Sequence, residues 1–335
     1  MSEDEIDRIE FANTRIALIR EEQVEAYLSA DDAIADLRAA FKAQAQEHAV
    51  NRPRIRVELG RSAWLHTLRA GIPIWNVTGG KDYTSLGPET PSMWATVIDT
   101  RTGFPLAFIE ANYLSRVRTA ATTAIATDLL APKGVTCLAH FGAGKISELL
   151  VRFVLKVRPS ITNVLLVRRE LKASPDWFQQ LESEVRVELC DAAGALLRAD
   201  LVTTATNSVT PVIPPNARMP GVHHLNFVGS NHHKKREIPA DLARRCLPPD
   251  GYLVVEDTNQ ARVEAGDFAA FGPEVLNWDT VPTLGHLLEN DGEKERAAKA
   301  TLTAFKSVGI GLMDLAVAAG VLRRMGLLPN SFIPD

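Results

Sequence analysis

The stretch VTCLAHFGAGKISELL, residues 135–150, decides how this sequence is expected to fold. It begins with an apolar run of strand length, residues 135–141, and turns through three small residues before apolar positions recur at helical spacing. A dinucleotide pyrophosphate requires this order of strand, glycine turn and helix. The glycines let the backbone approach the phosphates, and the start of the helix offers free N–H groups.

The turn itself departs from the full G-x-G-x-x-G spacing, because Ser147 occupies the third small position. Such a string is informative only in the right context, and the alternative interpretation is an ordinary strand-to-helix turn. A P-loop is excluded, since Ala139 stands where the first glycine should be and Ile146 follows the lysine. The predicted cofactor-binding residues of this turn are Gly142, Ala143, Gly144, Lys145 and Ile146.

Composition indicates a globular protein of about two domains, with 335 residues, 46% of them hydrophobic and 23% charged. The net charge of −4 gives no basic excess for nucleic acid or a membrane surface. The acidic first ten residues lack the apolar core of a signal peptide, and no apolar run is long enough to span a membrane. We therefore expect no nucleic-acid or membrane partner.

The three cysteines, Cys137, Cys190 and Cys246, are odd in number and widely spaced. This spacing fits neither a metal cluster nor a disulfide framework. Free buried thiols in a reducing compartment are expected, which favours a cytoplasmic location and no metal site.

The first 130 residues predict a mostly antiparallel sheet with one leading helix. Residues 1–14 are polar and are expected to be poorly ordered, and a helix is expected from an N-cap at Asp31 or Asp32. The alternation in residues 51–59 predicts a half-exposed strand that places Arg54 and Arg56 on one face. Further strands are predicted at 64–68, 74–77, 94–98 and 106–109, with a hairpin turn at 99–103.

The remainder predicts a parallel sheet covered on both faces, because strands and helices alternate. A helix from Arg118 to about Leu130 ends at Pro132–Gly134, where we place a domain boundary. The predicted strands are 135–141, 163–168, 185–190, 200–204, 222–228 and 252–256, and the predicted helices are 145–156, 174–183, 192–197 and 239–245. The apolar spacing of residues 302–322 predicts one long helix, which follows the last predicted strand and is therefore not expected to belong to the alternating sheet.

The end of the second strand indicates the cofactor. An acidic residue there suits the ribose hydroxyl of NAD, whereas arginine suits the 2′-phosphate of NADP. Here Arg168 and Arg169 precede Glu170. Two guanidiniums favour NADPH, with NAD as the alternative. A solvated arginine pair is the structural alternative. The loop that ends the strand at 200–204 is also expected to face the cofactor, through Thr204, Ala205 and Thr206.

Several strings together resemble the ornithine cyclodeaminase and mu-crystallin family. They occur in the order of that family and cover residues 50–320. The strings are Gly80-Lys81, residues 99–107, residues 114–121, the Gly142 loop, residues 199–206, Val228-Gly229 with Arg236-Glu237, and residues 305–316.

The resemblance implies an α/β protein with a Rossmann NAD(P)-binding domain, residues 132–302. It also implies an α+β substrate-binding and dimerisation domain, residues 1–131 with 303–335. A homodimer acting on the α-carbon of a small amino or imino acid is expected. The resemblance further adds Thr119, Val228 and Ser307 to the cofactor-binding residues.

Two positions depart from the family pattern. Where cyclodeaminases carry an aspartate, this chain has Asn231, which can orient a substrate but cannot act as a base near neutral pH. The usual Gln-Ala of the glycine loop is Ile146-Ser147, and serine is still small enough for the turn. The first departure argues against ornithine cyclodeamination.

The resemblance implies roles for further side chains. Lys81 follows two glycines and is expected to bind the substrate carboxylate or protonate the imine nitrogen. Arg118, at a helix start, is expected to bind a carboxylate, or else to form a structural ion pair. Arg54 or Arg56 is expected to supply a second contact, and the sequence does not choose between them. His66 is a further candidate on the substrate side.

Three functions are consistent with this pattern. The first is an NAD(P)H-dependent oxidoreductase acting on C=N or CH–NH₂ bonds, with Lys81, Arg118 and Asn231 at the reacting centre. The second is a cyclodeaminase-type lyase that retains NAD, against which Asn231 counts. The third is a non-enzymatic NADPH-dependent binder of small molecules like mu-crystallin.

Overall fold

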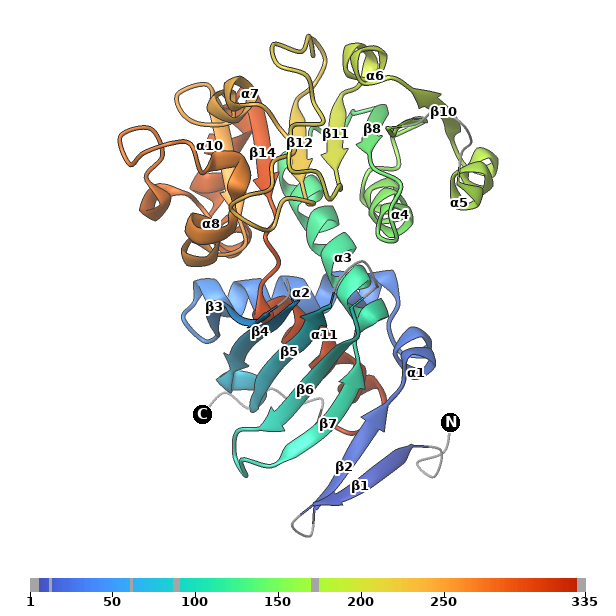
Figure 1. Cartoon of the computed structure of the whole chain (residues 1–335), viewed down its shortest axis with the longest axis vertical. Coiled ribbons are helices and arrows are strands. Elements are labelled where there is room, and N and C mark those ends of the chain that lie inside the picture. The colour runs from blue at the N-terminus through green and yellow to red at the C-terminus, as the bar shows by residue number, and fades with distance from the viewer. Residues whose placement is uncertain (1–5, 12–13, 61–62, 87–90, 170–174, 330–335) are drawn as a thin grey trace. The chain divides into compact units, whose positions relative to one another are not determined.

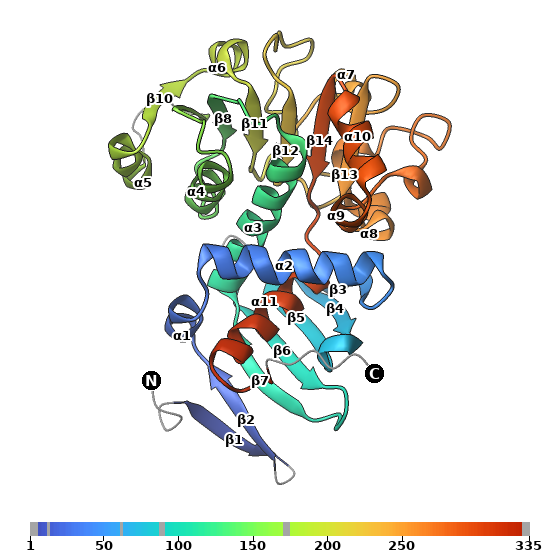
Figure 2. The same cartoon turned by 180° about the vertical axis from the view of Figure 1, so that it is seen from behind.

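A computed structural model describes residues 6–11, 14–60, 63–86, 91–169 and 175–329 of the chain. The chain forms two compact units, shown in Figures 1 and 2. The first unit comprises Met1–Ala121 with Ile310–Asp335, and the second comprises Thr122–Gly309. The α/β class predicted from the sequence is confirmed.

The first unit is built on a seven-stranded mixed sheet with the order β1-β2-β7-β6-β5-β4-β3. Neighbouring strands are antiparallel except for the parallel pair β2 and β7. The strands are β1 (Asp7–Phe11), β2 (Thr14–Ile19), β3 (Val50–Gly60), β4 (Ala63–Ile72), β5 (Val77–Ser85), β6 (Met93–Asp99) and β7 (Pro105–Glu110).

Helix α11 (Gly311–Arg324) packs on this sheet, and α2 (Ala30–Ala45) packs on α11. Every residue of α11 from Gly311 to Leu322 is buried, because the helix lies between sheet and helix. Figure 2 shows α2 crossing this region. The N-cap of α2 is Ser29, not Asp31 or Asp32, since the Ser29 hydroxyl accepts from the Asp32 N–H and the Asp32 carboxylate bonds back to Ser29.

The second unit contains an all-parallel seven-stranded sheet, with the order β10-β9-β8-β11-β12-β14-β13. Figure 1 labels β10, β8, β11, β12 and β14, which follow one another in this order across the sheet. The strands are β8 (Cys137–Phe141), β9 (Asn163–Val167), β10 (Arg186–Cys190), β11 (Leu201–Thr204), β12 (His224–Phe227), β13 (Gly251–Val255) and β14 (Leu302–Lys306).

The remaining helices connect and cover these strands. Part of the second unit's core is apolar side chains of β8 and β9 packed against Val151 and Val154 of α4. The helices are α1 (Glu21–Ala26), α3 (Asn112–Leu130), α4 (Ser147–Val157), α5 (Asp176–Gln180), α6 (Ala192–Arg198), α7 (Ala240–Arg245), α8 (Thr258–Glu264), α9 (Leu284–Glu289) and α10 (Asp291–Lys299), with short 3₁₀ turns η2 (Pro73–Trp75), η3 (Leu181–Ser183), η4 (Gly266–Phe268) and η5 (Trp278–Thr280).

The long helix predicted for residues 302–322 was wrong in its first part. Residues Leu302–Lys306 form β14, which lies between β12 and β13 in the sheet, and α11 begins only at Gly311. A short apolar run has the same appearance as a buried strand or a buried helix turn, so periodicity could not separate them. Helices α8, α9 and α10 were not predicted.

Three smaller predictions also need correction. Asp7–Phe11 form a strand where poor order was expected, because they pair with β2. Residues Pro73–Trp75 form a 3₁₀ turn, so the expected strand at 74–77 begins only at Val77. Helix α3 begins at Asn112, six residues before the predicted start at Arg118.

The three cysteines are free and buried, as predicted. Among the described residues, no cluster of metal-ligating side chains occurs. Within the same residues, none of the helices has the length and apolar character needed to cross a membrane.

Candidate active site

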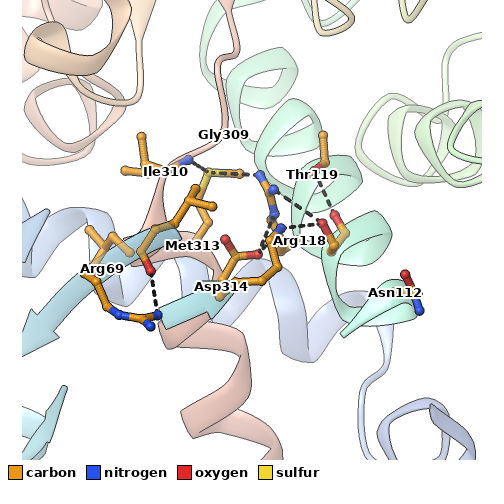
Figure 3. A network of polar contacts seen from close by, with 12 residues as sticks. Arg69, Asn112, Arg118, Thr119, Gly309, Ile310, Met313 and Asp314 are labelled. Carbon is orange, nitrogen blue, oxygen red and sulfur yellow. Dashed lines mark hydrogen bonds and ion pairs between the residues drawn. The ribbon is translucent and has the colours of Figure 1, made fainter. Parts of the chain in front are cut away.

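A buried cluster of charges lies in the first unit, where β5, α3 and α11 meet. Asp314 of α11 is fully buried, and its Oδ1 lies 2.9 Å from Nζ of Lys81 and 3.0 Å from Nε of Arg118. The Lys81 ammonium also donates to the Ser115 hydroxyl at 2.7 Å. Figure 3 shows Arg118 pointing from α3 toward Asp314 and Met313. One carboxylate therefore holds two cations.

Lys81 reaches this cluster from the middle of a strand, not from a loop. Gly79 and Gly80 precede it within β5, with φ angles of +147° and +148° that favour glycine. A Cβ at Gly80 would lie 1.9 Å from the Leu68 carbonyl oxygen, and one at Gly79 2.0 Å from that of Thr96. The two glycines thus let β5 pass closely between β4 and β6.

The environment of Lys81 favours its neutral form. Only 1% of the residue is exposed. Burial, together with the positive charges of Arg118 and Arg54, lowers the pKa of Lys81 to about 7 against the opposing effect of Asp314. A lysine with this pKa exchanges its proton readily near neutral pH, as an acid or base requires.

Arg118 lies in the second turn of α3, so the prediction of a position at the helix start was wrong. Its side chain is nevertheless buried, and besides Asp314 it contacts the Met313 sulfur at 3.7 Å and the Ser115 hydroxyl at 3.4 Å. Thr119, one residue on, donates its hydroxyl to the Ser115 carbonyl at 2.8 Å (Figure 3). The structure therefore brings Arg118 together with Lys81.

The other predicted substrate-side residues lie on β3 and β4. Arg54 and Arg56 are half-buried on β3, and Arg56 is paired in register with His66 on β4. The His66 ring stacks on Tyr83 with centroids 4.4 Å apart, and its Nε2 lies 3.1 Å from the Ser85 hydroxyl. Lys81 Nζ lies 5.7 Å from the same Tyr83 ring. His66 and Lys81 thus share one face of the sheet.

The glycine loop in the second unit fits a dinucleotide. Gly142 has a φ of +120°, and a Cβ there would lie 2.5 Å from the Ala205 carbonyl oxygen. No atom lies within 4 Å of a Cβ at Gly144, which leaves open space beside the loop. Helix α4 begins at Ser147 without a side-chain cap, and the Ser147 N–H donates to the Gly144 carbonyl of the loop at 3.0 Å. Ser147 is fully buried, as the small position requires.

Arg168 and Arg169 directly follow β9, where the sequence placed them. Arg168 is half-buried and Arg169 is exposed. Glu170, the acidic residue that would instead suit the ribose hydroxyl of NAD, lies outside the described residues.

The loops after β11 and β12 are joined by a carboxylate that the sequence prediction missed. Thr204 donates its hydroxyl to Glu237 at 2.8 Å, and the Thr206 N–H donates to the same residue at 2.6 Å. The Val228 N–H donates to the Thr204 carbonyl at 2.9 Å. Asn231 is half-buried in the loop that follows β12. Its N–H donates to the Gly229 carbonyl at 3.2 Å.

Ser307 follows β14, and its side chain is engaged within the protein. Its hydroxyl donates to Glu256 at 2.5 Å. Glu256 also accepts from the N–H groups of Val308 and Gly309, at 3.0 and 3.4 Å. A buried carboxylate therefore fixes the segment after β14.

The sequence prediction assigned no role to Asp314, Ser115 or Glu237. A signal for Asp314 existed, because it is the one carboxylate in the otherwise apolar or small-residue run 308–322. Ser115 and Glu237 stand within the family-like strings 114–121 and Arg236-Glu237, but their residue types alone indicated no role, since serine and glutamate are common on surfaces.

Comparison with known proteins gives consistent matches. The model of the ornithine cyclodeaminase/mu-crystallin family matches residues 15–326. A Delta(1)-pyrroline-2-carboxylate reductase of Bacillus cereus is 30% identical over 253 residues, which is 74% of this chain and 75% of that protein.

Two solved structures show the same fold. A probable ornithine cyclodeaminase from Bordetella pertussis Tohama I has a TM-score of 0.84 at 29% identity, covering 93% of this chain and 97% of that one. The Delta(1)-pyrroline-2-carboxylate reductase of Thermococcus litoralis, in complex with NADH and L-proline, has a TM-score of 0.82 at 22% identity, covering 94% and 99%.

Proposed function

We propose that this chain, which belongs to the ornithine cyclodeaminase/mu-crystallin family, reduces the C=N bond of an α-imino acid. Its relatives place it among the NAD(P)-dependent reductases and dehydrogenases of that family. The observation that carries the proposal is Lys81, a buried lysine with a pKa of about 7 held against Asp314 and Ser115. Reduction of an imine needs one hydride and one proton. Lys81 can supply that proton near neutral pH.

Each of the other residues has a part in this reaction. Arg118, with Arg54 or Arg56, binds the substrate carboxylate, because a guanidinium matches a carboxylate with two parallel hydrogen bonds. Thr119, the glycine loop, and the segments at Thr204–Thr206, Val228 and Ser307 hold the cofactor. The nicotinamide, when bound, supplies the hydride. Asn231 orients the substrate through hydrogen bonds.

The alternative functions differ in what they require. Cyclodeamination moves protons on and off an amine and delivers a nucleophile to an imine, which calls for a titratable carboxylate near the α-carbon. Asn231 has no proton to exchange near neutral pH. A binding protein without catalysis needs no proton donor, whereas the lowered pKa of Lys81 suits one.

The proposal predicts oxidation of NADPH or NADH, followed at 340 nm, when the protein is given a cyclic or acyclic α-imino acid. It predicts negligible conversion of ornithine to proline. Robust proline formation from ornithine, with ammonia released and no net change at 340 nm, would support the lyase and overturn the proposal. Saturable ligand binding without turnover across a panel of imino and amino acids would support the binding protein instead.

We further propose that NADPH is preferred to NADH, on the strength of Arg168 and Arg169 at the end of β9. Arg168→Ala should weaken NADPH binding by on the order of 1.5–3 kcal/mol, the value of a hydrogen bond to a charged group, and leave NADH binding unchanged. Calorimetric titration of both cofactors measures this. Arg186→Ala, an exposed arginine at the opposite end of neighbouring β10, is the matched control. Equal affinities in the wild type would contradict the preference.

The face of the first unit's sheet that points away from α11 supports a homodimer. Ile55, Val57 and Phe108 are 58%, 45% and 44% exposed on strands of this sheet, and Trp94 stacks on Phe108 with centroids 6.5 Å apart. Apolar side chains gathered on one face indicate a surface that a partner covers. Sedimentation equilibrium should give twice the mass of the chain, 36.6 kDa. A monomer at micromolar concentration would contradict the dimer.

A further inference from the structure

Glu237 is a fully buried carboxylate between β12 and α7 that none of the roles above uses. Its two oxygens accept four hydrogen bonds, all within the second unit. On the side of β11 they accept from the Thr204 hydroxyl at 2.8 Å and the Thr206 N–H at 2.6 Å. On the side of β12 they accept from the N–H groups of Gly229 and Ser230, at 2.7 and 3.3 Å.

The four donors share one place in the sheet. They lie at or just beyond the carboxyl ends of β11 and β12, which are neighbouring parallel strands. The two loops also touch directly, because a Cβ at Gly229 would lie 2.1 Å from the Thr206 carbonyl oxygen and 2.5 Å from Glu237 itself. Glu237 therefore connects two loops whose donors, Thr206 and Gly229, are 23 residues apart in the chain.

The backbone of Glu237 is held in place by a second buried carboxylate. The Glu237 N–H donates to Asp267 at 2.6 Å, and Asp267 lies 3.2 Å from the ammonium of fully buried Lys306. Lys306 in turn donates to the Phe227 carbonyl at 3.3 Å, at the end of β12. This support fixes Glu237 in one position, so the loops it binds are fixed as well.

In an open parallel sheet the ligand lies outside the carboxyl ends of the strands, where the strand order reverses. Here that point lies between β8, which carries the glycine loop, and β11. We propose that Glu237 is a positioning residue for the cofactor: it does not touch the nicotinamide nucleotide but sets the Thr204–Thr206 wall and the Gly229–Asn231 loop in their binding positions. The inference rests on NAD(P) binding by this unit.

A carboxylate is required because every group that faces it from these loops is a donor. Glutamine has nearly the same shape, but its NH₂ group would face one of the two loops as donor against donor. Glu237→Gln should therefore release one loop while keeping the volume filled. Asp200→Asn is the matched control, because Asp200 binds the Thr136 and Cys137 N–H groups, at 2.7 and 3.0 Å, at the opposite ends of β8 and β11.

Two measurements test the inference on the full chain. The first is the Kd of NADPH and NADH by calorimetry, which Glu237→Gln should raise at least about tenfold and Asp200→Asn should leave within about twofold. The second is hydrogen exchange without cofactor. Glu237→Gln should speed exchange of the Thr206 or Gly229 amide, whereas Asp200→Asn should speed exchange at Thr136 and Cys137 only.

Other results would overturn it. Cofactor binding by Glu237→Gln within about twofold of the wild type, or an equal loss in Asp200→Asn, would show a general structural role. If Glu237→Gln does not fold, Thr204→Val removes one donor and should raise Kd about fivefold; an unchanged Kd there contradicts the inference. A wild type that binds neither cofactor would overturn the proposed function too, whereas normal wild-type binding with an unaffected variant overturns this inference alone.

Discussion

Lys81→Met should reduce imino-acid reduction by about 10²- to 10⁴-fold, the usual contribution of a positioned general acid. Methionine fills the volume of the lysine stem but carries no proton. The loss should fall on kcat more than on the Kd of the cofactor, because Lys81 belongs to the first unit and the glycine loop to the second. Steady-state rates at 340 nm and calorimetric cofactor binding measure the two effects separately.

The pH dependence identifies the proton donor. The ammonium form of Lys81 donates, and its pKa is about 7. In the wild type, kcat/KM for reduction should be level below pH 7 and fall about tenfold per pH unit above it. Oxidation of the amino acid needs the neutral amine as base, so its rate should rise through the same pKa. Lys81→Arg stays charged throughout this range, so its kcat/KM profile should show no change of slope near pH 7.

Two outcomes would contradict a donor role for Lys81. One is full reductase activity in Lys81→Met. The other is an identical break near pH 7 in Lys81→Arg, which would assign it to the substrate or another residue. Folding of the variants is checked by denaturant unfolding.

Lys81 also makes the free energy of unfolding depend on pH. The folded-state pKa of about 7 lies below the ordinary lysine value of 10.5, so between these values the unfolded chain binds more protons. This group therefore makes the wild type more stable as pH rises through that interval. Lys81→Met should lack this gain.

Asp314→Asn should destabilise the protein and shift the pH profile at the same time. The change leaves the Lys81 and Arg118 cations buried without the carboxylate that now lies about 3 Å from each. Breaking a buried ion pair in this way costs on the order of 3 kcal/mol or more. Because Asp314 holds the pKa of Lys81 up, its removal should move the kinetic break below pH 7.

The comparison variants isolate the charge effect. Asp291→Asn removes a carboxylate that is 92% exposed in its pair with Lys294 and should leave the free energy of unfolding nearly unchanged, because solvent screens this pair. In a Lys81→Met background Asp314→Asn should cost less than alone, since only Arg118 then remains to be balanced. Asp314 would be shown not to act on Lys81 by either of two results. One is a double variant whose loss of unfolding free energy equals the sum of the two single losses. The other is a kcat/KM profile in Asp314→Asn that still changes slope at pH 7.

The parts of this protein that could be predicted from its sequence are those set by local order. In residues 135–150 the strand, the turn and the helix are neighbours in the chain, so their pattern indicated β8, the glycine loop and α4. The alternation that predicted β3 is local too. Lys81 and Arg118 were recognised through strings shared with a family, and their roles remain predictions.

The tertiary structure decided what the chain brings together over long distances. Asp314 lies 196 residues from Arg118, and no local pattern pairs a carboxylate with a cation so far away. Glu237 reaches Thr204 across 33 residues. Strand β14 enters the sheet between β12 and β13 because strand order depends on which edges remain to be paired, not on sequence order. Local sequence order determined the strand, glycine turn and helix around residues 137–157, whereas folding determined which charges are buried against one another, because burial energy depends on contacts that exist only in the folded state.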